Sequence, residues 1–88
     1  MNTYERQNAM LGLEFNRYVL EHPAFAARIP RGAQVVLQLA KDPQFNTWAR
    51  RLAKRQREPG QPVVVVTIEK VQPPKSRLVS PRLQVEAA

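Results

Sequence analysis

The chain has 88 residues, no cysteine and a formal net charge of +7 at neutral pH. A chain of this length forms one small domain, which buries only about 60–65% of the surface that its unfolded form exposes, so a partner surface is expected to add to its stability. The lack of cysteine excludes disulfides, thiolate metal sites and a cysteine nucleophile. There is also no apolar run long enough to span a bilayer and no secretory pattern at residues 1–8, and a cytoplasmic protein is therefore expected.

The first predicted element is a helix over residues 4–21, capped by Asn2 or Thr3 and ended by His22-Pro23. Its apolar residues form two stripes on nearly opposite sides, whereas a helix in a simple monomer shows one. Two stripes predict contact on two sides, with the chain's own sheet and with a partner. The candidate contact residues are Tyr4, Leu11 and Phe15 on one stripe and Met10, Leu13 and Leu20 on the other, depending on which stripe faces inward.

A strand–helix–strand pattern follows a short helical turn at residues 23–28. We expect strands at about 33–39 and from Pro62 through 68, and a helix from Pro43 to about Arg57 that is capped by Asp42. Strands joined by a helix lie parallel with a right-handed crossover. The run of valines at 63–66 does not alternate, which predicts a strand covered on both faces.

The predicted fold is therefore α/β, with a small βαβ core of parallel strands and the N-terminal helix covering the second face. We expect a single α/β domain at 1–71 and an extended, proline-rich C-terminal arm at 72–88. Two strands alone form a marginal sheet. The missing edge is expected from residues 77–79 or 83–85 of the arm, or from another subunit.

The excess positive charge lies in the central segment, because residues 31–57 carry a formal charge of +6. On the helix at 43–57, basic side chains lie opposite the apolar stripe that contains Trp48 and Leu52. Such a face can neutralise phosphates of a nucleic acid, but a solvated outer face with a favourable interaction with the helix dipole is the preferred explanation. The candidate nucleic-acid residues are Arg50, Arg51, Lys54, Arg55 and Arg57.

Other chemistry has weak support in the sequence. His22 is the single histidine, and no neighbouring group is placed to orient it as a catalyst, so a helix-end role is expected. The carboxylates are widely spaced, and no second histidine or aspartate cluster suggests a metal site. The loop after the first strand contains Lys41 but no glycine, which disfavours a phosphate cradle. We therefore expect no enzyme activity, no metal and no cofactor.

The order of caps, turns and strands resembles a family of small prokaryotic proteins catalogued as a domain of unknown function. The resemblance covers roughly residues 10–70, and it implies a prokaryotic cytosolic source and supports the βαβ fold. It implies no activity, cofactor or catalytic residue, and Gln38 and Lys41 depart from the more acidic loop associated with the family. The segments that carry it are NRYVLEHP at 16–23, IPRGAQVV at 29–36, Asp42-Pro43 and AKRQREPGQPVV at 53–64.

The leading functional hypothesis is a non-enzymatic module that acts as a homodimer or beside another protein, with no membrane contact. The two-sided first helix, the small sheet and the extended arm support it. The alternative is a nucleic-acid-binding accessory protein that uses the basic face of the helix at 43–57.

Overall fold

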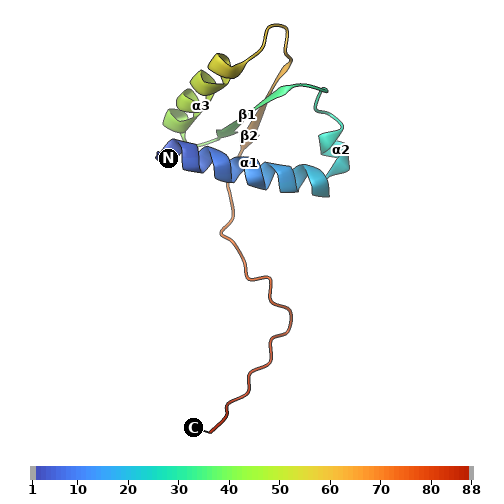
Figure 1. The fold of residues 1–88 in the computed structure, drawn as a ribbon, viewed down its shortest axis with the longest axis vertical. Helices are drawn as coiled ribbons and strands as arrows, with labels where there is room; N and C mark the ends of the chain where they lie inside the picture. Colours follow the sequence, from blue (N-terminus) through green and yellow to red (C-terminus); the bar gives the residue numbers. More distant parts are fainter. Residues whose placement is uncertain (1, 88) are drawn as a thin grey trace.

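A computed structural model describes residues 2–87, and the terminal residues 1 and 88 of the expected domain and arm lie outside the described part. The elements are α1 (Thr3–Glu21), α2 (Pro23–Ala26), β1 (Gln34–Leu39), α3 (Pro43–Gln56) and β2 (Val63–Ile68). Each matches a predicted element to within one or two residues. Figure 1 shows the helices gathered around the two strands, with the C-terminal segment leading away from them.

Both long helices begin where their capping residues predict. The Asn2 side chain accepts a hydrogen bond from the Glu5 N–H at 2.8 Å at the start of α1. The Asp42 side chain accepts one from the Phe45 N–H at 3.1 Å at the start of α3. In each case the cap occupies a backbone donor that the helix itself leaves free.

The two strands are parallel, as expected for a βαβ unit, and the register runs from Gln34 opposite Val63 to Leu39 opposite Ile68. The turns before the strands contain Gly32 and Gly60, each with φ of 76°. This left-handed conformation is one that residues with a side chain rarely adopt.

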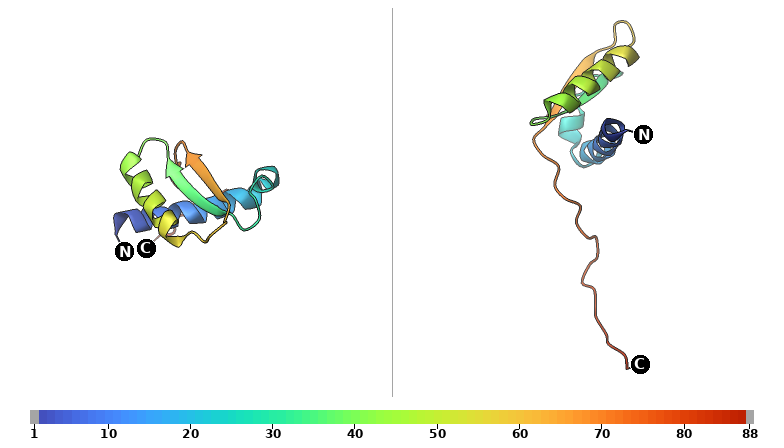
Figure 2. Two further views of the ribbon diagram at one scale, coloured as in Figure 1. Left: turned by 90° about the horizontal axis from the view of Figure 1, so that it is seen from above. Right: turned by 90° about the vertical axis from the view of Figure 1, so that its left-hand side faces the viewer.

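The core lies where the two long helices meet the sheet. Phe45 of α3 is 0% exposed, and the buried cluster around it contains Leu11, Leu37 and Ala49. Helix α3 packs on β1, whereas α1 crosses the other side of the sheet (Figure 2). The expected cover on both faces is therefore confirmed for β1, whose central residues Val36, Leu37 and Gln38 are all buried.

Polar side chains fix α3 to β1, an arrangement that sequence patterns do not predict. Asn46 forms two hydrogen bonds with the backbone of Leu39: its Oδ1 accepts from the N–H at 2.8 Å, and its Nδ2 donates to the carbonyl at 2.7 Å. Gln34 donates to the Ala53 carbonyl in the last turn of α3 at 2.7 Å. These contacts satisfy backbone groups at the exposed edge of the strand and at the helix end.

The prediction that β2 is covered on both faces is wrong. Its residues alternate between exposed and half-buried, and Val63 and Val65 are 39% and 41% exposed. Helix α3 lies over β1 and does not extend over β2, so the side of β2 that carries these two valines has no cover. The uninterrupted valine run was misleading because it is typical of a buried strand, but it does not show whether other elements of the chain cover that strand.

Residues 69–87 contain no helix or strand and are exposed throughout. This segment extends away from the folded body in Figures 1 and 2. The radius of gyration is 18.2 Å, against about 12 Å for a compact chain of this length. The expectation that residues 77–79 or 83–85 of the arm supply a third strand within the chain is wrong, because the sheet contains β1 and β2 alone among residues 2–87.

Candidate functional site

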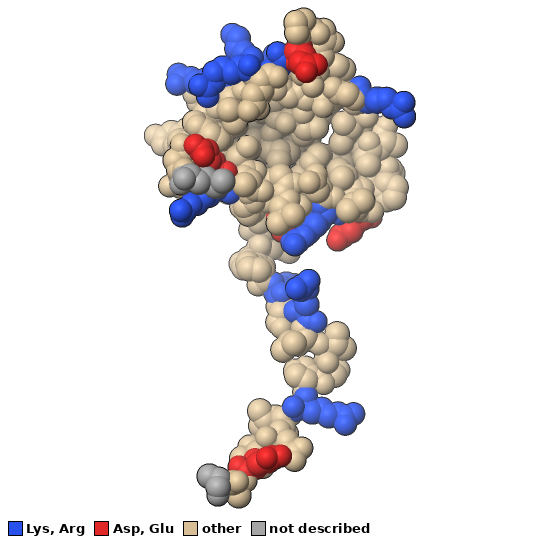
Figure 3. Space-filling model, viewed as in Figure 1, with Lys and Arg blue, Asp and Glu red and all other residues tan. Residues whose placement is uncertain are grey.

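An apolar groove lies between α1 and β2, with a volume of about 1230 Å³. We call it the α1–β2 groove. Its apolar lining comes from α1, from α2 and from the inward face of β2, and the first residues of the arm form one wall. Figure 3 shows that uncharged residues form the hollowed centre of the body, while charged side chains lie around the rim. The apolar side chains that line the groove are Met10, Leu11, Phe15, Tyr18, Phe25, Val66, Ile68 and Val71.

The charged residues that line this groove carry a net positive charge, because Arg17, Lys70, Lys75 and Arg77 outnumber Glu14 and Glu69. Glu14 and Arg17, which both line it, form an ion pair at 2.8 Å on successive turns of α1. Glu69 and Lys70 enter the lining side by side at the end of β2. The floor of the groove is apolar, and sites of this kind suit an apolar occupant that is held by a small number of polar groups at the rim.

The structure separates the two stripes of α1. Tyr4 packs on Phe45 and Trp48, with ring centroids 6.0 and 5.8 Å apart. Phe15 packs on Phe25 at 6.3 Å, and Leu11 is 1% exposed, so this stripe faces inward. It forms the core and the floor of the groove.

The other stripe of α1 is exposed. Met10 is 40% exposed and lines the groove, whereas Leu13 and Leu20, at 54% and 81% exposed, do not line it. Of the six candidate contact residues, only Met10 combines exposure with a place in the groove. A role of any of the six in binding a partner stays a prediction.

Sequence analysis predicted that the sheet lacks an edge strand, but it did not identify the outer edge of β2 as the open one. In the parallel ladder, Gln34 donates to the Pro62 carbonyl and Ala40 to that of Ile68, so the even-numbered residues of β2 pair with β1. The backbone groups of Val63, Val65 and Thr67 therefore point away from β1, along an edge with no neighbouring strand among residues 2–87. The only sequence signal for this edge was the shortage of strands.

The basic face of α3 is divided in two. Arg57 donates from Nε to Gln34 Oε1 at 3.0 Å. Arg50 reaches the amide of Gln38, whose oxygen accepts from Nε at 2.9 Å and from Nη2 at 3.0 Å when it faces the guanidinium. These two arginines therefore tie α3 to β1.

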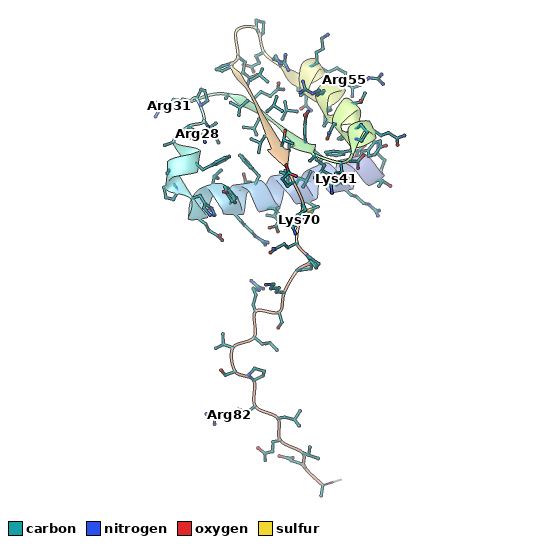
Figure 4. The ribbon with its side chains drawn as sticks, turned by 180° about the vertical axis from the view of Figure 1, so that it is seen from behind. Arg28, Arg31, Lys41, Arg55, Lys70 and Arg82 are labelled. Atoms are coloured by element: carbon teal, nitrogen blue, oxygen red, sulfur yellow. The ribbon has the colours of Figure 1, made fainter. Side chains whose placement is uncertain are left out.

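The remaining members of that face, Arg51, Lys54 and Arg55, are exposed. Within the described part of the chain, none of the three lies at ion-pair distance from a carboxylate. Figure 4 shows Arg55 extending from α3 away from the strands. Three of the five candidate nucleic-acid residues therefore extend into solvent, whereas Arg50 and Arg57 each donate to a glutamine of β1.

His22 occupies a helix end, as expected. It caps α1, its Nδ1 lies 2.8 Å from the Tyr18 carbonyl oxygen, and its ring stacks on that of Tyr18 at 3.9 Å. Over residues 2–87, no group of three histidine, cysteine or acidic side chains is close enough to hold a metal ion. Lys41 and Lys70 share a smaller pocket of about 280 Å³ with Asp42 and Glu69, so its charges cancel.

A sequence model of a family of unknown function, DUF5647, matches residues 3–81. The chain belongs to this family. The match spans α1 through β2 and reaches into the arm, which agrees with the resemblance seen in the sequence. No curated protein and no solved structure gives a significant match. Among the described helices of this DUF5647 member, none is long and apolar enough to cross a membrane.

Proposed function

We propose that the protein is a non-enzymatic interaction module that acts in the cytoplasm as a homodimer, and that the dimer forms on the α1–β2 groove and the outer edge of β2. The observation that carries this proposal is the incomplete sheet. A two-stranded sheet is marginal in water, and here it leaves unpaired backbone groups directly beside an apolar groove. One added strand would pair these backbone groups and cover the apolar groove.

Several features support association on this side of the molecule. Val63 and Val65 expose apolar surface on a strand whose outer edge is unpaired, and natural proteins normally cover or charge such edges. Addition of a strand to an open edge is also a common mode of recognition, in which backbone hydrogen bonds give affinity and side-chain pockets give specificity. Leu13 and Leu20, by contrast, are exposed on α1 but do not line the groove.

A pair of single substitutions on α1 tests which side associates. Met10→Glu places a charge at the edge of the groove, and Leu13→Glu places the same charge on the outer side of the same helix. We expect Met10→Glu to raise the dimer dissociation constant by at least about 30-fold, because a carboxylate is desolvated at the interface. Leu13→Glu should change it less than threefold, a difference below about 0.7 kcal/mol.

Sedimentation equilibrium measures both constants, and circular dichroism confirms that both variants remain folded. The reverse order, with Leu13→Glu the more damaging change, would assign the interface to the outer stripe and contradict the proposal.

Nucleic-acid binding is a second candidate, favoured by the exposed and unpaired cluster of Arg51, Lys54 and Arg55. Three phosphate contacts would make the logarithm of affinity fall with the logarithm of salt concentration with a slope of about −2 to −3. The test variant is Arg51→Glu/Lys54→Glu/Arg55→Glu. Its matched control, Lys75→Glu/Arg77→Glu/Arg82→Glu, changes the net charge equally but in the arm.

Fluorescence anisotropy with duplex and single-stranded oligonucleotides is the measurement for this second candidate. Binding that is lost in the α3 variant and retained in the arm variant would support it. Equal loss in both variants would indicate only non-specific attraction, and no binding at about 50 mM salt would exclude the candidate.

A further inference from the structure

We infer that the strand missing from each sheet is the C-terminal segment Arg82–Ala87 of a second copy, so that two chains exchange arms. This inference rests on the proposed homodimer and names what fills its interface. Residues 82–87 alternate strictly between polar and apolar side chains, which is the pattern of a strand with one buried face. They follow residue 81, where the family match ends, so the inference concerns this chain.

The apolar residues of this segment have no contact surface in their own chain. Leu83 is 91% exposed and Val85 is 85% exposed, and they are among the most exposed large apolar side chains in the described structure. A strand that alternates in this way gains stability only when its apolar face is covered. The segment is therefore built for a surface that its own folded body does not supply in this conformation.

The α1–β2 groove offers that surface in the required geometry. Val64, Val66 and Ile68 are the half-buried residues of β2, and Val66 and Ile68 form its apolar contribution to the groove. A third strand beside β2 would place Leu83 and Val85 on this same side, over the aromatic floor. Its polar residues Arg82, Gln84 and Glu86 would lie on the opposite, solvent-facing side.

The lengths also agree. Strand β2 has six residues, as does the segment from Arg82 to Ala87, and each spans about 20 Å when extended. The unpaired backbone groups along the outer edge of β2 would then find partners along the whole added strand. The added strand would thus form the backbone hydrogen bonds of β2 and bury its apolar side chains in the groove.

The connection favours a second copy over the chain's own sheet. Residues 69–81 join β2 to the segment and span up to about 40 Å when extended. This length exceeds the 32 Å intermediate dimension of the molecule, so the segment can reach a second copy. Pro73 and Pro74 favour an extended backbone for themselves and for the residues before them, which opposes a reversal of the chain at 72–74. Figure 1 shows the arm leading straight away from the body.

The first test compares two double variants of the full chain with equal net charge. Leu83→Gln/Val85→Gln removes the apolar face of the segment, whereas Arg82→Gln/Glu86→Gln changes only its polar face. We expect the first to raise the dimer dissociation constant by at least about 30-fold and the second to change it less than threefold. Sedimentation equilibrium provides both values.

The outcomes separate this inference from the proposed function. If both double variants dimerise like the unmodified chain, the arm exchange is wrong while the dimer stands. If the unmodified chain is monomeric, both are wrong. If it is monomeric and Leu83→Gln/Val85→Gln lowers its unfolding midpoint, the segment docks on its own chain, and this too overturns the exchange.

A second measurement shows whether the contact is between chains. Because the protein has no cysteine, Glu86→Cys accepts a single nitroxide label on the polar face of the segment. Chains that carry the nitroxide but no isotope are mixed with nitrogen-15-enriched chains that carry no nitroxide. Any broadening of the nitrogen-15 chain's resonances is then intermolecular. We expect broadening of Phe15, Tyr18 and Phe25, which line the groove, and not of Lys54 on α3. Broadening centred on α3, or no broadening in a sample that is dimeric, would contradict the inference.

Discussion

Phe45→Ala is expected to remove about 3–5 kcal/mol from the free energy of unfolding, as measured for deletions of buried aromatic side chains. Phe45 is 0% exposed and contacts the rings of Tyr4 and Trp48, so it joins α3 to α1 as well as to the sheet. An 88-residue domain has a total stability of only about 5–10 kcal/mol. The substitution should therefore leave a substantial unfolded population at physiological temperature.

Urea denaturation followed by far-ultraviolet circular dichroism measures this loss, at one low protein concentration so that association does not contribute. Leu20→Ala is the control, because Leu20 lies on α1 but is 81% exposed, and a change within about 0.5 kcal/mol is expected. Similar losses in the two variants would mean that the core is not centred on Phe45.

Asn46→Ala should have the next largest effect, with a loss of about 2–3 kcal/mol. Both hydrogen bonds from the Asn46 amide to the Leu39 backbone disappear, and each unsatisfied group that is shielded from water costs about 1–3 kcal/mol. The expected loss lies at the low end of the summed cost of the two groups, because Asn46 and Leu39 are only half-buried. The same denaturation experiment measures the loss.

Thr47→Ala is the matched control for this effect. Thr47 is the next residue of α3, and its hydroxyl also donates to a backbone carbonyl, that of Pro43, at 3.0 Å, but this contact is exposed. Its loss should cost less than about 0.5 kcal/mol. If Thr47→Ala were as damaging as Asn46→Ala, the amide of Asn46 would have no special role at the edge of β1.

The elements of the fold could be predicted because their signals are local. Asn2 and Asp42 cap the helices, and the glycines at 32 and 60 mark the turns before the strands. The strand–helix–strand order then specified the parallel pairing, since a helical crossover returns the chain in the same direction. These signals depend only on residues that are near each other in the sequence.

Burial of β2 could not be predicted in the same way, because it depends on how far α3 reaches across the sheet. Val63–Val66 would suit a strand covered on both faces, yet the single helix α3 lies over β1 and leaves Val63 and Val65 exposed. For the same reason, the sequence could not show which basic residues of α3 contact β1 and which extend into solvent. Arg50 and Arg57 lie at helical spacing beside Lys54, but only the packed structure places them against Gln38 and Gln34.

The candidate site shows the same limit. Sequence analysis included Met10, Leu11 and Phe15 among six possible contacts. It did not include Val66, Ile68 or Phe25, which complete the groove. These residues come from separate elements, and their meeting depends on the crossing of α1 under β2. The shortage of strands was the one global feature that the sequence did reveal. The expectation that residues 77–79 or 83–85 supply the missing edge within the chain was wrong, and its supply by another subunit stays a prediction.

Association of the unmodified full chain is the most direct test of a homodimer built on that open edge. Sedimentation equilibrium from about 1 μM to about 1 mM covers the range in which weak and moderate dimers dissociate. We predict that the average mass rises with concentration from the monomer value of 10.1 kDa towards twice that value. A mass that stays at the monomer value over the whole range, in a sample with an intact fold, would contradict it.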